Sequence, residues 1–221
     1  MGVLLDLLLP NRCSACELPG AAFCSGCRDA LIRLSPPLCA RCGSPGAWPV
    51  RRCAECSGRR IAFAGARAAI VYDERARCFV HAWKERGLRS LSRDAASLVC
   101  ETLSPPAVAA LTFVPADGDR ALKRGHRPAE SLARELGRIW RLPVEPLVRR
   151  ARSVQRQRGL GLDARRRNVR DAFAPAGPAP ASVCLVDDVY TSGATATAAA
   201  SALRKGGARR VEVMTLARAV R

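Results

Sequence analysis

The sequence predicts an α/β protein, with a mostly parallel sheet that carries helices on both faces and is preceded by a small cysteine-rich domain. Three observations predict this class. Short apolar runs alternate with helix-like segments from residue 61 onward, one apolar run leads through a short polar loop into an Ala-rich helix, and most cysteines gather before residue 57. A chain of 221 residues allows one domain of ordinary size and a small one, so we expect domains at 1–60 and 61–221.

The elements expected after residue 60 follow from apolar runs and from the prolines and glycines that interrupt them. Strands are expected within 61–72 and at Leu111–Val114, Pro143–Leu147, Val183–Val186 and Arg210–Leu216. Helices are expected at Arg75–Lys84, Leu88–Leu103, Pro128–Trp140 and Thr195–Lys205. The start of the chain, Met1–Pro10, is interpreted as a short helix or packing arm, and Ala174–Ala181 as a connector.

The first 56 residues contain four C-x-x-C pairs: Cys13/Cys16, Cys24/Cys27, Cys39/Cys42 and Cys53/Cys56. Two thiolates in one tight turn present their sulfurs to a single metal, so each pair is half of a tetrahedral zinc site. Pairing in chain order gives two structural zinc sites, a double zinc ribbon; a cross-braced pairing, first with third and second with fourth, is the alternative that spacing leaves open. The three other cysteines, Cys78, Cys100 and Cys184, are expected to pack in the core.

The charge balance favours polyanionic partners. Lys and Arg number 37 against 19 acidic residues, a formal net charge of +18, and the alternative interpretation is a solvated basic surface. No run approaches the roughly 18 apolar residues of a membrane span, so we expect no membrane insertion. We expect a cytoplasmic protein, in which cysteines bind metal and do not form disulfides.

The stretch Ser182–Gly207 has the composition of a strand, a short polar loop and a helix. Small residues with hydroxyl groups at a helix start leave backbone N–H groups free for an anion, and the helix dipole favours negative charge there. Asp187 and Asp188 follow the apolar run at the carboxyl end of the expected strand, where carboxylates can accept hydrogen bonds from a vicinal diol. A sugar phosphate fits both features.

The segment Val183–Thr195, VCLVDDVYTSGAT, resembles the phosphoribosyl pyrophosphate (PRPP) motif of the type I phosphoribosyltransferases. This resemblance implies that Asp187 and Asp188 contact the ribose hydroxyls. It also implies that the 5′-phosphate is wrapped by the loop residues Thr191, Ser192, Gly193, Ala194 and Thr195. The fold expected for residues 61–221 is then that of a type I phosphoribosyltransferase.

Two basic segments are candidates for further phosphate contacts. The loop after the strand at Leu111–Val114 is rich in glycine and basic residues, and a pyrophosphate could be held there by Arg120, Lys123, Arg124 and Gly125; an exposed basic loop is the alternative. Lys84 is either a pyrophosphate ligand or a solvated lysine at a helix end. The Arg-rich stretch at about 149–173 is expected to be a mobile loop with a short helix, and its candidates include Arg152.

The order of motifs along the whole chain resembles the ComF family of competence-associated, phosphoribosyltransferase-like proteins. After the paired C-x-x-C motifs, the matching residues are Lys84 and Gly87, Val114-Pro115, Arg124-Gly125, then Gln157, Arg165, Asn168 and Ala172-Phe173, and finally the PRPP motif. Two positions depart from the family: His126-Arg127-Pro128 follows the Arg-Gly step, and Thr191 stands where several nucleobase-specific transferases carry an acid.

Two functions follow from the resemblance. The first is a PRPP-binding protein that handles single-stranded DNA during natural transformation, alongside a helicase-like partner; the net charge and the zinc ribbon agree with it. Aromatic residues are only 5% of the chain, so contacts to the DNA backbone would have to dominate. The alternative is an active phosphoribosyltransferase, in which Mg²⁺ bound with PRPP bridges pyrophosphate and ribose oxygens while an acceptor such as a nucleobase displaces pyrophosphate.

Overall fold

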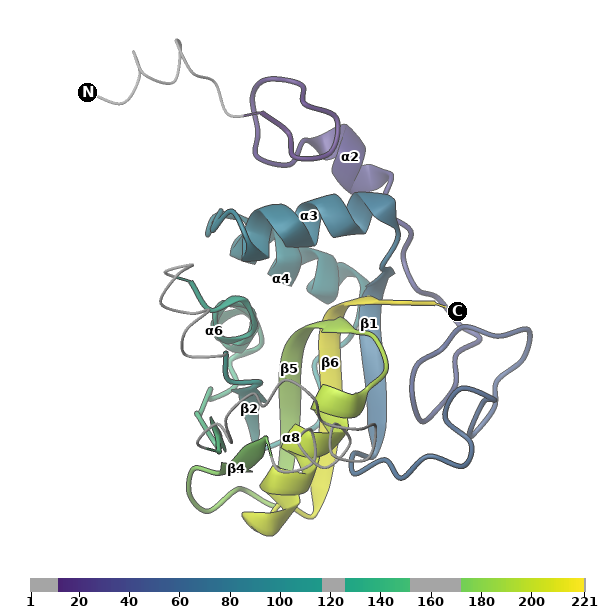
Figure 1. Ribbon diagram of the computed structural model, residues 1–221, viewed down its shortest axis with the longest axis vertical. Coiled ribbons are helices and arrows are strands. Elements are labelled where there is room, and N and C mark those ends of the chain that lie inside the picture. The colour runs from purple at the N-terminus through teal and green to yellow at the C-terminus, as the bar shows by residue number, and fades with distance from the viewer. Residues whose placement is uncertain (1–11, 117–125, 152–171, 221) are drawn as a thin grey trace, which may run out of the picture.

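A four-stranded parallel sheet forms the centre of the molecule (Figure 1). The computed structural model describes residues 12–116, 126–151 and 172–220. The strands lie in the order β1-β6-β5-β2, and their bounds are β1 Gly65–Val71, β2 Ala110–Phe113, β5 Ser182–Tyr190 and β6 Arg210–Arg218. Every neighbouring pair in this sheet is parallel. The helices within these described ranges are α2 Ser25–Asp29, α3 Glu74–Lys84, α4 Leu91–Thr102, α6 Pro128–Trp140 and α8 Ala194–Lys205.

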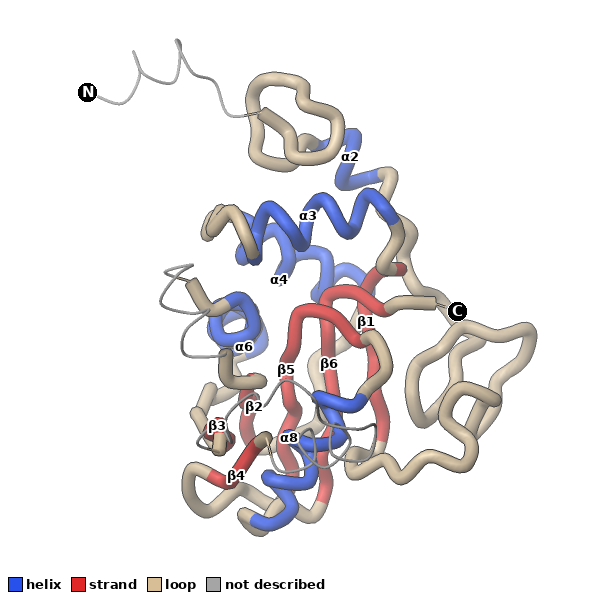
Figure 2. The backbone as a smooth tube through the Cα atoms, viewed as in Figure 1, coloured by secondary structure: helices blue, strands red, loops and turns tan. Residues whose placement is uncertain are grey.

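Helices cover both faces of the sheet because the central strand β5 buries side chains on both sides. Cys184 and Val186 belong to the core that includes α3, α4 and α6, whereas Val183 and Leu185 belong to the core beneath α8. This alternation is the two-residue period of a strand, and a near-continuous apolar run is what a doubly covered parallel strand requires. Figure 2 shows α8 in front of the sheet. The predicted α/β class with helices on both faces is confirmed.

Local signals set the ends of several helices. Asp73 precedes α3, and its carboxylate accepts a hydrogen bond from the backbone N–H of Ala76 at 2.8 Å. Pro128 is the first residue of α6, where a missing N–H costs no helical hydrogen bond. The predicted helices at 75–84, 128–140 and 195–205 are confirmed to within one residue, whereas the helix predicted from Leu88 begins at Leu91. None of the helices in the described residues is long and apolar enough to cross a membrane.

The strand predicted at Pro143–Leu147 is wrong. Only Val144 pairs there, in an isolated parallel bridge to Leu111. The ladder stops because the N–H of Leu147, its next donor, bonds instead to the backbone oxygen of Glu145 at 3.0 Å and to the hydroxyl of Thr112 at 3.3 Å. The extended segment instead becomes β3, Val148–Arg150, which pairs antiparallel with β4, Phe173–Pro175. Both ends of the predicted Arg-rich loop are therefore strands, and the expected connector begins only after Pro175.

Candidate functional site

The connection from β5 to α8 leaves backbone N–H groups at the start of α8 without a side-chain cap. Gly193 is the N-cap residue with φ of 71°, a left-handed conformation that favours glycine, and it has no side chain with which to cap the helix. Ser192 Oγ accepts only a 3.4 Å hydrogen bond from the N–H of Ala194. Unlike α3, which Asp73 caps, α8 keeps its first-turn donors and the positive end of its dipole available for an anion.

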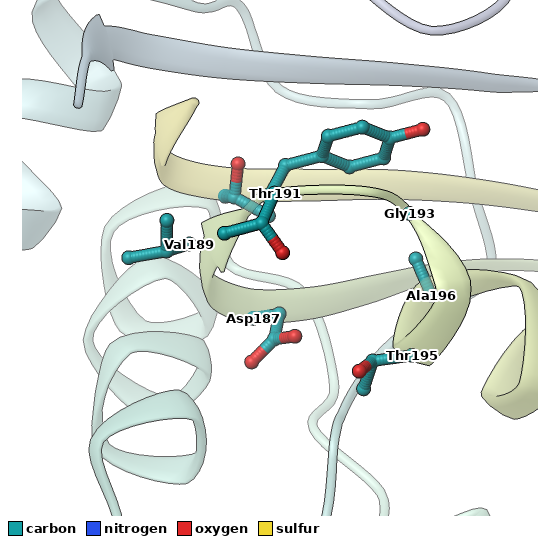
Figure 3. A pocket seen from close by; sticks show the side chains of 8 residues that line it. Asp187, Val189, Thr191, Gly193, Thr195 and Ala196 are labelled. Carbon is teal, nitrogen blue, oxygen red and sulfur yellow. The ribbon is translucent and has the colours of Figure 1, made fainter. Parts of the chain in front are cut away.

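A small open pocket lies at this helix end. It is lined by Asp187, Val189, Tyr190, Thr191, Gly193, Thr195, Ala196 and Thr215. Figure 3 shows the Asp187 carboxylate and the Thr195 side chain on the same side of the connection. Hydrogen-bond acceptors from β5 therefore face the N-terminus of α8 across one cavity, at the carboxyl ends of the parallel strands, where α/β sheets bind ligands.

Asp187 and Asp188 point to opposite faces of β5, as successive residues of a strand must. Asp187 lines the pocket beside α8. Asp188 is not among the pocket residues; it is buried on the other face and forms an ion pair with Nζ of Lys84, the last residue of α3. Lys84 therefore lies at the carboxyl end of β5, where it pairs with Asp188, and it does not line the pocket.

The environment of Asp187 disfavours its charged form. Burial, followed by the negative charge of Asp188, raises the pKa of Asp187 to about 8, while the N–H of Asp188 donates to its Oδ1 at 2.9 Å. A carboxyl group in this state is ready to ionise when a ligand supplies positive charge or hydrogen-bond donors. A perturbed acid in a pocket is typical of a functional site.

Several predicted site residues lie outside the described residues. These are Arg120, Lys123, Arg124 and Gly125 in the first basic segment, and Arg152, Gln157, Arg165 and Asn168 in the second. Of the predicted phosphate loop, Thr191, Gly193 and Thr195 line the pocket, while Ser192 and Ala194 do not.

The eight cysteines of the four C-x-x-C pairs form two groups in chain order and not in the cross-braced order. We call Cys13, Cys16, Cys24 and Cys27 the first cysteine cluster, and Cys39, Cys42, Cys53 and Cys56 the second cysteine cluster; within each, all sulfurs lie within 4.8 Å of one another. The two clusters occupy separate places in Figure 1, the first above α3 and the second beside β1.

Both clusters have the dimensions of tetrahedral zinc sites. With Zn–S bonds of about 2.3 Å, a tetrahedron places its sulfurs about 3.8 Å apart. The measured Sγ–Sγ distances are 3.6 Å for Cys16–Cys24, 3.7 Å for Cys39–Cys56 and 3.4 Å for Cys42–Cys53. Although burial raises it, donation from the backbone N–H groups of Cys24, Cys16 and Ala15 lowers the pKa of the Cys13 thiol to about 6. Four close sulfurs with N–H donors fit structural zinc, and the cysteines supply every ligand.

Sequence reasoning missed two residues near the pocket. Thr215 lines it from β6, where it is the register partner of Asp187, and Arg218 ends the same strand. A signal existed for both, because each is a polar residue near the carboxyl end of an apolar strand, where ligand-contacting residues gather.

The structure is thus a parallel α/β protein in which the VCLVDDVYTSGAT segment leads from strand β5 into helix α8, with two four-cysteine clusters before the sheet. Residues 4–58 match the family described as "Double zinc ribbon domain". The chain is 29% identical over 224 residues to Competence protein F of Haemophilus influenzae, covering 94% of this chain and 97% of that protein. It is 28% identical to DNA utilization protein YhgH of Salmonella typhimurium, with coverage of 96% and 99%.

A further relative is Competence protein ComFC of Streptococcus pneumoniae, 25% identical over 90% of this chain and 88% of that protein. These relatives confirm the resemblance to the ComF family. Among solved structures, the glutamine PRPP amidotransferase from B. subtilis overlaps 57% of this chain and 25% of its own, with 22% identity and a TM-score of 0.38.

Proposed function

We propose that this protein binds PRPP together with Mg²⁺ at the connection from β5 to α8, and that it handles single-stranded DNA in natural transformation. One observation carries the first part: the carboxyl group of Asp187 faces the uncapped N-terminus of α8 across a single pocket. An anion site beside a diol acceptor is the minimum that a phosphorylated ribose requires.

Each part of the pocket has a role in this proposal. The 5′-phosphate accepts hydrogen bonds from the first-turn N–H groups of α8 and from the hydroxyls of Thr191 and Thr195. Asp187 accepts from the ribose hydroxyls, and Asp188 does so from the other side of the strand end. Mg²⁺, which prefers oxygen ligands, would neutralise charge on the pyrophosphate.

In the free protein, the ion pair between Lys84 and Asp188 neutralises the charge of both side chains next to the expected ligand position. A pyrophosphate group carries more negative charge than one carboxylate, so it attracts the Lys84 ammonium group. Lys84 would then contact both groups or exchange one for the other. In this proposal Arg120, Lys123, Arg124 and Gly125 complete the pyrophosphate side, and Arg152, Gln157, Arg165 and Asn168 approach from the second basic segment.

The DNA-handling part is supported by the relatives' names and by charge. Proteins named for competence and DNA utilization match nearly the whole chain, and the net charge of +18 favours a polyanion. We place the protein in the cytoplasm, with the zinc ribbon at 1–60 and the phosphoribosyltransferase-like domain at 61–221, and we expect a helicase-like partner.

Isothermal titration of the zinc-loaded full-length protein with PRPP and Mg²⁺ tests the site. Asp187→Asn should weaken PRPP binding at least about tenfold, since it removes an ionisable acceptor from the ligand diol. Asp29→Asn, at an exposed position of α2, is the matched control and should bind as wild type. Equal affinity for all three proteins would exclude Asp187 from the site.

Repeating the titration with a single-stranded oligonucleotide present tests the second part. A shift in PRPP affinity would show that the two ligands are thermodynamically coupled, as a DNA-handling protein that responds to PRPP requires. No oligonucleotide binding at low salt, with pyrophosphate released on addition of nucleobases, would instead identify an active phosphoribosyltransferase.

A further inference from the structure

Arg218, the last residue of β6, is a buried cation that connects the sheet to the second cysteine cluster. Its side chain is 1% exposed. Nη1 donates to the backbone oxygen of Cys42 at 2.6 Å, and Nη2 lies 2.6 Å from Oε2 of Glu55 and 3.7 Å from Sγ of Cys42. A buried guanidinium is tolerated only where such partners replace water, so the geometry of the second cysteine cluster determines where Arg218 can lie.

The same guanidinium group packs on Tyr190, the last residue of β5. Its central carbon lies 4.6 Å from the ring centroid of Tyr190, which is 5% exposed. Tyr190 and Arg218 are also register partners at the ends of their strands, and the N–H of Ala219 donates to the backbone oxygen of Tyr190 at 2.9 Å. Both the side chain and the backbone of Tyr190 are thus held by the end of β6.

Tyr190 in turn lies directly against the proposed phosphate loop. A Cβ atom built on Gly193 would come within 2.2 Å of the Tyr190 hydroxyl oxygen, so the ring occupies the space beside the Gly193 backbone. If the ring shifted, it would either collide with Gly193, the N-cap residue of α8, or leave that residue without support. Direct contacts run without interruption from Cys42 through Arg218 and Tyr190 to Gly193.

We propose that Arg218 is a positioning residue, through which the second cysteine cluster holds Tyr190 and the start of α8 in the arrangement that binds phosphate. Metal loading of the second cysteine cluster then sets the affinity of the pocket, whereas metal loading of the first does not. The predicted effect on PRPP affinity rests on the proposed function. The predicted effect of Arg218 on the start of α8 does not depend on any ligand.

The first cysteine cluster provides the contrast within the same chain. Among its described contacts, the aromatic ring of Phe23 meets Phe79 of α3 edge-on at a centroid distance of 4.9 Å. Arg28 of α2 pairs with Glu101 of α4. These contacts lead to helices, and α3 reaches the carboxyl end of β5 through Lys84, its last residue.

The test compares two arginines on the same strand. Arg218→Met should weaken PRPP binding at least about tenfold, with two zinc ions still bound, since charged hydrogen bonds of this kind each contribute about one power of ten or more. Arg218→Lys keeps the charge over Tyr190 and should restore part of the affinity. Arg210→Met is the matched control: Arg210 begins β6, is exposed and pairs with Glu212, and its variant should bind PRPP as wild type.

Hydrogen exchange of the backbone at residues 191–197, without ligand, separates this inference from the proposed function. Both Arg218→Met and removal of zinc by a chelator should accelerate exchange there, and Arg210→Met should not. Faster exchange in a protein that does not bind PRPP would support the coupling and refute the PRPP site. Unchanged exchange and unchanged PRPP affinity in zinc-loaded Arg218→Met would overturn the coupling. If Arg218→Met does not fold, Arg218→Lys and the chelated wild type decide by the same two readouts.

Discussion

The two cysteine clusters have the same motif and nearly the same sulfur spacing, but they attach to the α/β domain in different ways. The first cysteine cluster docks on helices α3 and α4 through side chains, with Phe23 on Phe79 and Arg28 on Glu101, and only the segment after it bonds to β1, where the N–H of Leu34 donates to the Ala69 oxygen at 2.9 Å. The second docks on β1 from within its own C-x-x-C turn: the N–H of Ala66 in β1 donates to the Arg41 oxygen at 3.0 Å.

The difference shows that one sequence motif can serve two structural purposes. If the first cysteine cluster loses its contacts with α3 and α4, the sheet can keep its geometry. The second cysteine cluster is instead hydrogen-bonded to β1 and, through Arg218, to the end of β6 beside the pocket. We therefore expect damage at the first cluster to lower stability, and damage at the second to lower stability and ligand binding together.

The largest expected effect comes from removing one ligand of each metal. Cys16→Ser, at an exposed cysteine, and Cys42→Ser, at a buried one, should each lose one zinc ion and several kcal/mol of folding free energy, on the order expected for a structural site. Only Cys42→Ser should also weaken PRPP binding, by about tenfold or more. Zinc content by mass spectrometry and titration calorimetry measure both. Equal loss of PRPP affinity in the two variants would remove the distinction between the clusters.

The docking of the first cluster should depend on Phe23. Truncating this buried ring in Phe23→Ala should lower the free energy of unfolding by about 3 kcal/mol, because a cavity opens against α3. Trp48→Ala, at a 72% exposed aromatic residue of the second ribbon, should change it by less than about 0.5 kcal/mol. Urea unfolding of the zinc-loaded proteins provides the comparison, and a small effect of Phe23→Ala would mean that the first ribbon contributes little to folding.

The backbone docking of the second cluster can be tested with two glycines of matched conformation. Gly43 and Gly58 have φ of 72° and 71°, but a Cβ on Gly43 would lie 2.5 Å from the Ala66 oxygen, whereas Gly58 has open space around it. Gly43→Ala should therefore cost about 1–3 kcal/mol more than Gly58→Ala. The difference in unfolding free energy reports the close approach alone, since the conformational cost cancels. Equal costs would contradict that approach.

Changes in pH should affect the pocket and the first ribbon in opposite ways, because the pKa of Asp187 in the pocket is raised and that of Glu101 beside the first ribbon is lowered. Asp187 has its pKa raised to about 8 from 3.8, so the folded state holds a proton that the unfolded state releases. Its contribution to stability is complete below pH 3.8 and is lost as pH rises to about 8, at up to about 1.4 kcal/mol per pH unit. Asp187→Asn should remove this decline. Parallel stability profiles for wild type and variant between pH 5 and 8 would show that Asp187 is ionised in the free protein.

The smallest effect is expected at the ion pair of the first ribbon. The hydrogen bond from Arg28, against a smaller effect of burial, lowers the pKa of Glu101, so this stabilisation is present above pH 4.5 and lost as pH falls below it. The pair is partly exposed, and a double-mutant cycle of Arg28→Met and Glu101→Gln should give a coupling of about 0.2–1 kcal/mol at neutral pH. The coupling should fall with added salt; a value that does not change with salt would argue against a charge interaction.

The sequence by itself determined the features that local spacing and periodicity encode. The C-x-x-C pairs indicated two four-cysteine sites, the apolar run before Asp187 indicated a doubly covered strand, and the hydroxyl-rich loop indicated a helix start suited to an anion. The predicted strand at Pro143–Leu147 is wrong although its apolar pattern is clear, because the N–H of Leu147 bonds to Glu145 and Thr112 instead of extending the ladder with β2.

Only the tertiary structure decided which distant residues meet at the site. Strand periodicity places Asp187 and Asp188 on opposite faces, but it does not say that Lys84 reaches Asp188 or that Thr215 lies beside Asp187. Arg218 and Cys42 are 176 residues apart, and nothing in either segment indicates the other. The physical reason is that such contacts follow from the order of strands in the sheet and from where each ribbon docks, which long-range packing determines and local sequence does not.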